Sequence, residues 1–430
     1  MSADTETSPT GGTANGSAVD QAAVDRREAL SGKRYRLLIG IALGLVALSA
    51  VRAFSGAGDL TSGGTVGGAL SLAVPIGMAG LGGLWAERAG VVNIGLEGMM
   101  ILGTFGAGWI GWQHGPWAGV LAAIAFGAIG GLVHAIATIS FGVDHIVSGV
   151  AINILGLGVT QFLASVLLEG TPGGGESQSP RIPALSTLSF PGSDDALGPI
   201  EKHGWFVISD LAGILRGLTT NVSVLTLVAL ALVIGSYYVL WQTPFGLRLR
   251  ACGEDPYAAE SLGVKVYLHK YIAVLVSGGL AGFAGAYLAI VASGIYREGQ
   301  TGGRGYIGLA AMIFGNWRPG GLLAGAGLFG YTDAMQLRNA AAVHALLLVI
   351  AVILAGLTIV SLTRRRFVAA AIAFGVGVLA VVWYARTDVL PDQITFMTPY
   401  VTTLLVLALA SQRLRMPKAD GLVYRRGGSR

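Results

Sequence analysis

Residues 243–270 read TPFGLRLRACGEDPYAAESLGVKVYLHK and separate two long apolar runs of the chain. Within this stretch Asp255 and Pro256 predict a helix start. Asp accepts hydrogen bonds from first-turn amides, and Pro loses no bond at the first helical position. Gly263 is a natural helix stop a few residues later. The stretch therefore predicts a short capped helix outside the apolar runs.

The two flanking runs are typical of the whole chain. Of its 430 residues, 53% are hydrophobic and only 12% are charged, whereas soluble domains carry about 25% charged residues. The mean hydropathy is +0.67. Many of the 67 glycines lie inside the apolar runs, and in lipid small residues let helices approach closely. This composition predicts an all-α polytopic membrane protein with tightly packed helices.

The composition also excludes several classes of function. The net charge of +5 does not indicate a nucleic-acid partner, because the basic residues gather in loops and tails, where membrane topology places them. Cys252 is the only cysteine and the six histidines are scattered, so no disulfide, metal site or cofactor is predicted. The sequence has no catalytic arrangement and no GxxxxGKS or GxxxxGKT loop, so any ATP must be bound by a partner chain.

Twelve apolar stretches approach the ~20 residues that a membrane-spanning helix needs. They lie at about 37–54, 65–85, 91–112, 117–139, 145–168, 222–241, 271–293, 305–316, 320–337, 344–362, 367–384 and 396–411. The sequence thus predicts about twelve transmembrane helices in one domain over residues 36–411. We expect this domain to be surrounded by membrane lipid.

The positive-inside rule orients these spans, because cytoplasmic loops carry an excess of Lys and Arg. An inside N-terminus puts 243–270, the turn at 364–366 and a C-terminal tail over 412–430 on the cytoplasmic side. The Gly- and Pro-rich stretch 169–221 becomes an external loop. Residues 1–35 predict a disordered cytoplasmic tail, which is too long for the n-region of a signal peptide. We therefore expect a multi-pass plasma-membrane protein with both termini inside.

This topology puts the capped helix within 243–270 on the cytoplasmic face. A short helix at that face, flanked by basic residues, is a docking element. It suggests that something outside the membrane drives this protein.

An internal repeat is predicted from two pairs of segments. GPWAGVLAAIAFGA at 115–128 and RPGGLLAGAGLFGY at 318–331 share Pro and Phe-Gly at the same spacing. Each follows a Gly-rich polar break, ERAGVVNIGLEG at 87–98 and REGQTGGRGYIG at 297–308. The topology gives the copies opposite orientations, as in transporters with broken helices. The predicted core is two inverted repeats of about five helices each.

Four polar residues are candidates for a solute path: Glu87, Asn93, Glu97 and Asp333. Polar groups at membrane depth usually face a cavity or one another. Asn93 and Glu97 are spaced to share one helix face toward such a path. A cytoplasmic hairpin over 87–98 is equally open, with Glu87 in solvent and Glu97 bound to backbone amides. Asp333 fits either a pore lining or a capped helix end.

Two further positions have simpler interpretations. The second break, which contains Arg297 and Arg304, is expected at the outer surface. Asp144 stands directly before a predicted span and indicates an ordinary N-cap.

Two motifs carry a resemblance to a known family. ERAGVVNIGLEGMMILGTFGA at 87–107 and TPFGLRLRACGEDPYAAESLGV at 243–264 closely resemble permease subunits of bacterial ABC importers. The branch is that of nucleosides and simple sugars, in the group that includes ribose and branched-chain amino acid permeases. The resemblance covers residues 60–340 and 390–425. Between them, over 340–390, the chain departs from the family with an inserted helix pair.

The resemblance implies a transport subunit that is not an enzyme, in a bacterial cell membrane. The implied partners are cytosolic ATPase subunits, a second permease (homologous or identical) and an extracytoplasmic solute-binding lipoprotein. Residues 87–98 would lie by the translocation path. The implied coupling helix, inserted into the ATPase, comprises Gly253, Glu254, Asp255, Pro256, Tyr257, Ala258, Ala259 and Gly263.

The functional hypothesis is an ATP-driven importer permease for a nucleoside, or else for a simple sugar. Both solutes are neutral and polar, which fits a path with few fixed charges. The alternative is a proton- or ion-coupled secondary transporter that uses Glu87, Glu97 or Asp333 as a proton site. The capped cytoplasmic helix argues against this alternative, because such a carrier needs no docking element.

Overall fold

The computed structural model describes residues 38–427 except for 339, 389, 392, 396, 399–400, 403 and 405–413. Within this part, eight helices are long and apolar enough to cross a membrane, which confirms the all-α polytopic class. The predicted N-terminal tail, 1–35, and most of the predicted last span, 396–411, lie outside the described residues.

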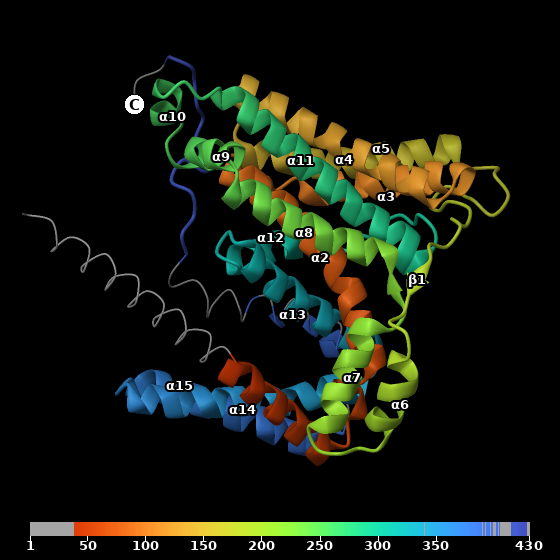
Figure 1. Cartoon of the computed structure of the whole chain (residues 1–430), viewed down its shortest axis with the longest axis vertical. Helices are drawn as coiled ribbons and strands as arrows, with labels where there is room; N and C mark the ends of the chain where they lie inside the picture. Colours follow the sequence, from red (N-terminus) through yellow and green to blue (C-terminus); the bar gives the residue numbers. More distant parts are fainter. Residues whose placement is uncertain are drawn as a thin grey trace, which may run out of the picture.

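Long helices packed side by side form the centre of the molecule (Figure 1). Two of them continue as π-helical turns, α4 through Ile136–Ser140 and α11 through Tyr287–Ser293. The bundle contains α2 (Gly63–Arg88), α3 (Leu96–His114), α4 (Pro116–Ala135), α5 (His145–Leu167), α8 (Val224–Gln242), α11 (Val266–Ala286), α12 (Arg304–Phe314) and α13 (Pro319–Arg338).

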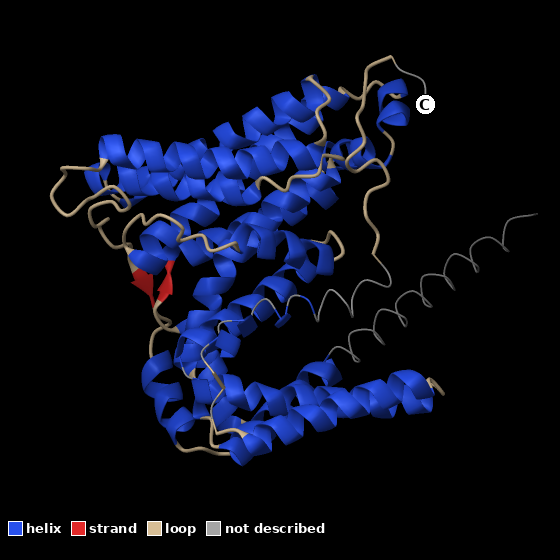
Figure 2. Cartoon of the chain, turned by 180° about the vertical axis from the view of Figure 1, so that it is seen from behind, coloured by secondary structure: helices blue, strands red, loops and turns tan. Residues whose placement is uncertain are grey.

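The two ends of the bundle carry different elements (Figure 1). At one end, α9 (Pro244–Glu254) and α10 (Pro256–Ser261) follow α8, and the C-terminal residues 414–427 lie against them. We call this the α10 end. The opposite end, the α7 end, contains α6 (Ser193–Lys202), α7 (Ile208–Thr219) and the antiparallel strands β1 (Thr187–Leu188) and β2 (Val222–Ser223), which Figure 2 draws in red.

A separate group of helices lies at the edge of the bundle (Figure 1). α14 (Ala340–Thr363) and α15 (Phe367–Arg386) form a hairpin that corresponds to the predicted helix pair over 340–390. Its turn, which contains the arginines 364–366, lies at the α10 end. The helix over 38–55 packs against this group through Val51 and is followed by the short helix η1 (Gly58–Leu60).

The predicted spans agree with the observed helices for most of the chain. Eight of them coincide with the membrane-length helices. Three more, at 91–112, 305–316 and 320–337, overlap α3, α12 and α13. With its 11 residues, α12 is too short to cross a bilayer, because a spanning helix needs about 20. The total of about twelve spanning helices therefore stays a prediction.

Glycines hold the bundle helices at close distance. A Cβ atom added at Gly127 on α4 would lie 2.3 Å from the carbonyl oxygen of Gly278 on α11. One added at Gly330 on α13 would lie 2.5 Å from the carbonyl oxygen of Ala69 on α2. No side chain fits at such separations, so the backbones themselves are in contact. This confirms the close helix packing predicted from the glycine content.

Candidate functional site

The capped helix at the α10 end has the predicted boundaries. Oδ1 of Asp255 accepts hydrogen bonds from the amides of Tyr257 and Ala258, at 3.2 and 3.1 Å. Pro256 is the first residue of α10. Gly263, with a φ of +81°, turns the chain in the left-handed region that glycine adopts without strain. The local signals were sufficient to predict this helix.

One side of this capped helix faces away from the protein. Ala258, Ser261 and Gly263 are exposed, and Leu262 is 85% exposed. The other side is buried, with Ala259 in a small apolar cluster. A short helix with small exposed residues and one protruding leucine offers a surface that another protein can contact.

The base of the capped segment is joined to the end of α2. A Cβ atom at Gly253 would lie only 2.3 Å from the carbonyl oxygen of Arg88, so a glycine is needed for this contact. Nζ of Lys270, at the start of α11, donates to the carbonyl oxygen of Gly90 at 3.3 Å. The segment therefore packs directly on the point where α2 ends and the first polar break begins.

The first break is buried and is not helical. Residues 89–95 lie between α2 and α3, and their backbone polar groups bind side chains from neighbouring helices. The amide of Val92 donates to Nδ1 of His145 at 3.1 Å, and the carbonyl oxygen of Ile94 accepts from Nδ2 of Asn153 at 3.1 Å. Backbone of this kind is tolerated at membrane depth only inside protein or beside a water-filled cavity. The buried segment does not match the solvent-exposed hairpin considered above.

Asn93 lies in this break, so the predicted helix face shared by Asn93 and Glu97 is wrong. Helix α3 begins at Leu96, after Asn93. Oδ1 of Asn93 accepts from the amide of Gly95 at 3.1 Å, a local bond that competes with helix formation. Its Nδ2 donates to Ser277 on α11 at 2.8 Å. The side-chain amide of Asn93 thus holds the first break against α11.

Glu97 joins the two breaks to one another. Its carboxylate accepts from the amides of Gly303 and Gly305, at 2.9 and 2.7 Å. Gly303 stands directly before α12 and Gly305 lies in its first turn, where a helix has no partners of its own for these amides. Because Glu97 also lies in the first turn of α3, one buried carboxylate stands at the positive ends of two helix dipoles.

An ion pair lies beside this joint. Nη2 of Arg304, the first residue of α12, is 2.6 Å from Oδ2 of Asp333 on α13. Arg297 is exposed as expected, but Gly303 and Arg304 reach the buried carboxylate and the part-buried Asp333. The prediction that the second break lies at the outer surface is therefore wrong for its second half. The physical reason is that the free amides of α12 need an acceptor inside the bundle.

Glu87 lies apart from the other three candidates, at the α10 end. It is 3% exposed, and its Oε2 accepts from the indole of Trp317 at 2.6 Å. Arg88 donates to the carbonyl oxygen of Trp317, also at 2.6 Å. Glu87 and Arg88 thus attach the end of α2 to the turn between α12 and α13. Asp144 caps α5 as predicted, through the amides of Ile146 and Val147.

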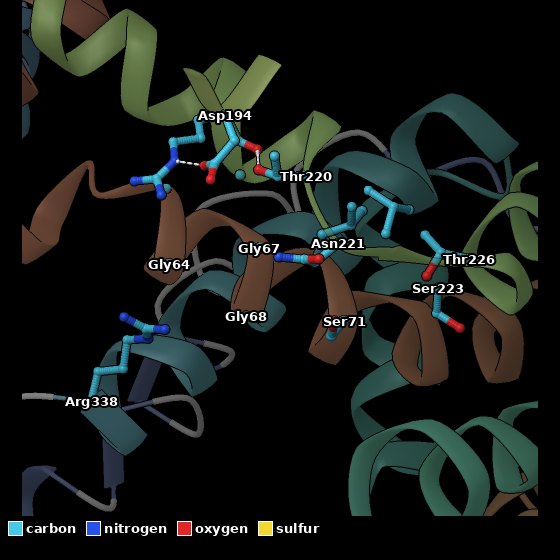
Figure 3. A pocket seen from close by; sticks show the side chains of 15 residues that line it. Gly64, Gly67, Gly68, Ser71, Asp194, Thr220, Asn221, Ser223, Thr226 and Arg338 are labelled. Carbon is cyan, nitrogen blue, oxygen red and sulfur yellow. Dashed lines mark hydrogen bonds and ion pairs between the residues drawn. The ribbon is translucent and has the colours of Figure 1, made fainter. Parts of the chain in front are cut away.

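The sequence did not indicate a polar cavity of about 420 Å³ near the α7 end. Figure 3 shows Gly64, Gly67 and Gly68 of α2 on one side and Asn221 with Thr226 on another. Arg338 comes from α13, and an ion pair of 2.6 Å between Arg216 and Asp194 lies at the rim. The repeated glycines of GGTVGG, at residues 63–68, could have indicated a helix face without side chains. They could not indicate which residues lie opposite that face. Among the described residues, no cluster of His, Cys, Asp and Glu could hold a metal ion.

Comparisons with known proteins find related permeases. The family described as branched-chain amino acid transport system / permease component matches residues 65–357. The guanosine ABC transporter permease protein NupQ of Bacillus subtilis is 34% identical, over 83% of this chain and 95% of its own. The nucleoside ABC transporter permease protein NupC of Lactococcus lactis is 31% identical, over 83% and 94%.

The putative glucose ABC transporter permease protein TsgC13 of Haloferax volcanii is 36% identical, over 61% of this chain and 73% of its own. No solved structure matches.

Proposed function

The chain belongs to the branched-chain amino acid transport system permease family, as a permease subunit of an ABC importer, and we propose that its solute is a nucleoside. The observation that carries this proposal is similarity to a guanosine and a nucleoside permease over more than nine-tenths of their lengths. The likeness to a putative glucose permease keeps a simple sugar as the second candidate.

The α10 end is the cytoplasmic end in this proposal. The exposed arginines 364–366 and the basic residues of 414–427 gather there, as cytoplasmic segments of a membrane protein do. The α7 end, with residues 169–221, would then face outward. Both termini would lie in the cytoplasm of a bacterial cell, where the tails 1–35 and 412–430 belong.

The capped helix would be the contact with a cytosolic ATPase. Its exposed small residues and Leu262 fit a role in which α10 enters a groove of a separate ATP-hydrolysing chain. The coupling residues would be those of Gly253–Gly263. A solute-binding lipoprotein would dock at the α7 end, and a second permease, identical or homologous, would complete the pore.

Two inverted repeats would form the core. The repeats are supported by matching contacts between them. Helix α4 packs on α11 in the same way as α13 packs on α2, each through a glycine. In the same way, Gly103 of α3 meets Gly282 of α11, and Gly308 of α12 meets Gly80 of α2. Helices with equivalent positions in the two repeats thus make equivalent contacts. With α14 and α15 as an inserted pair, the chain would have about twelve crossings.

The solute path would run past the joint between the two breaks. In inverted-repeat transporters, binding sites lie where broken helices meet near the bilayer midplane. Asn93, Glu97 and Asp333 stand at or beside that joint, and Glu87 would lie at its cytoplasmic exit. The polar cavity near the α7 end, large enough for a small solute, would be the entrance.

Proton coupling is less favoured by the same contacts. Glu97 is held by two amides and Asp333 by an arginine. A proton carrier needs a carboxyl group that can lose its partners and reach water. These two carboxylates instead fasten helices together.

Uptake by proteoliposomes tests the proposal. The complete transporter should accumulate a radiolabelled nucleoside only with ATP and the binding protein present, and should do so without an ion gradient. Excess unlabelled glucose should not compete. Uptake driven by a proton gradient alone would overturn the importer mechanism, whereas competition by glucose and not by nucleosides would leave the sugar as the solute.

A further inference from the structure

The C-terminal residues 414–427, which we call the strap, cross the capped segment at the α10 end (Figure 1). The amide of Ala419 donates to the carbonyl oxygen of Gly253 at 2.9 Å. The amide of Lys418 lies 3.4 Å from Oε2 of Glu254. The strap therefore binds the hinge between α9 and α10 through its backbone.

An aromatic contact fixes the strap to α10 itself. The ring of Tyr424 is 5% exposed and lies between Tyr257 of α10 and Tyr267 of α11, with centroids 5.1 and 5.4 Å away. Aromatic pairs at such distances stabilise beyond their buried area. Arg426 also approaches Glu260 at 3.5 Å, but it is largely exposed, and exposed pairs contribute little.

The strap also touches the first break and the turn that follows α12. The amide of Arg415 donates at 2.7 Å to Oδ1 of Asn316, in the turn that follows α12. The carbonyl oxygen of Ala419 lies 3.1 Å from where a Cβ of Gly90 would be, at the start of the first break. The strap thus contacts α10, the first break and the turn between α12 and α13 at once.

We propose that the strap is a positioning element of the ATPase-coupling site, which makes α10, the first break and the turn after α12 move as one body. This inference rests on the proposed role of α10 in contacting an ATPase. Helix α10 has only 6 residues, and so short a helix is not stable by itself. It is flanked by glycines at 253 and 263, where the backbone has most freedom. The Tyr424 ring completes the apolar cluster that holds it.

Substitution of Tyr424 tests the strap in the complete, reconstituted transporter. Tyr424→Ala should leave the ATPase bound but lower solute uptake per ATP hydrolysed at least about threefold, within the range of coupling changes that such mutations make. Tyr424→Phe, which keeps the ring, should behave like the wild type. Arg426→Ala is the matched control from the exposed side of the strap and should have no effect. Unchanged uptake per ATP in Tyr424→Ala would overturn the proposal.

A cross-link gives an independent result if Tyr424→Ala fails to fold. Glu260→Cys and Arg426→Cys, in a Cys252→Ala background, can be joined by a short bismaleimide. If strap and α10 move together, the cross-linked transporter should keep its uptake rate. Loss of uptake on cross-linking would show relative motion and overturn the proposal. Failure of the importer itself is distinguishable, since the wild type would then transport without ATP.

Discussion

At the scale of single residues, Glu97 decides how the two broken segments meet. Its two oxygens accept hydrogen bonds from two amides at the start of α12. The partners are separated by more than 200 positions in the sequence. A carboxylate at this place therefore serves as a joint, whatever further contact it makes with a solute.

Glu97→Ala should destabilise the permease by about 1–3 kcal/mol, because two buried amides lose their acceptor. Glu97→Gln keeps one acceptor oxygen and should be milder. Thermal unfolding in detergent measures the difference. Equal stability of the wild type and both variants, with uptake lost in both variants, would contradict the structural role of Glu97 and favour a proton site.

Asp420 of the strap predicts a pH dependence. The pKa of its carboxyl group is raised from 3.8 to about 9, first by burial and then by the nearby Glu87, whereas Lys270 opposes the rise. Because the folded-state pKa is raised, the strap is most stable at low pH and loses stability as pH rises toward that value. Trypsin cleavage after Lys418 and Arg425 should therefore accelerate from neutral to alkaline pH.

The matched control for this experiment is Asp420→Asn. It removes the titrating group, so its cleavage rate should follow only the pH profile of trypsin. Identical pH profiles for the wild type and Asp420→Asn would contradict the assignment to Asp420.

At the scale of elements, the sequence predicts what is local. The capped helix α10 is specified by Asp255, Pro256 and Gly263, which act on their immediate neighbours, and its boundaries are confirmed. The depth of the second break was not predictable, because it depends on a carboxylate from α3. The polar cavity and the strap contacts were missed for the same reason. Each is made by segments that are distant in the sequence.

Ala258→Trp should prevent co-purification of the ATPase while the permease remains folded. Ala258 is exposed, so the indole does not disturb the interior and blocks only a partner. Glu254→Arg should have the same effect. Ala196→Trp, at an exposed position of α6 on the opposite end, is the control. Retained ATPase in both the Ala258 and the Glu254 variants would remove the capped segment as the coupling element.

Helix packing gives a further prediction at this scale. Gly127→Ala and Gly330→Ala should each cost about 1–3 kcal/mol, because the added methyl group overpacks a backbone contact. Gly235→Ala on α8 is the control, since its Cβ would have no atom within 4 Å. Thermal unfolding in detergent should separate the two groups. Similar midpoints for all three would contradict the close backbone packing.

At the scale of the whole molecule, the two ends have to face opposite sides of one membrane. The helix over 38–55 leads from the α10 end to α7, where Arg52 pairs with the buried Asp210 at 2.7 Å. The α14–α15 hairpin returns its arginine turn to the α10 end. These connections fit a chain whose basic segments stay on one side, as the positive-inside rule requires.

Cysteine labelling tests this arrangement in intact cells. In a Cys252→Ala background, Ala196→Cys on α6 should react with a membrane-impermeant maleimide from outside. Ala258→Cys on α10 should react only after the cells are opened, because the proposed topology puts the α10 end in the cytoplasm. Both positions are exposed, so burial cannot explain a difference. Labelling of Ala258→Cys in intact cells would invert the topology, and an ATPase could then not reach α10, which would remove the physical basis for ATP-driven coupling.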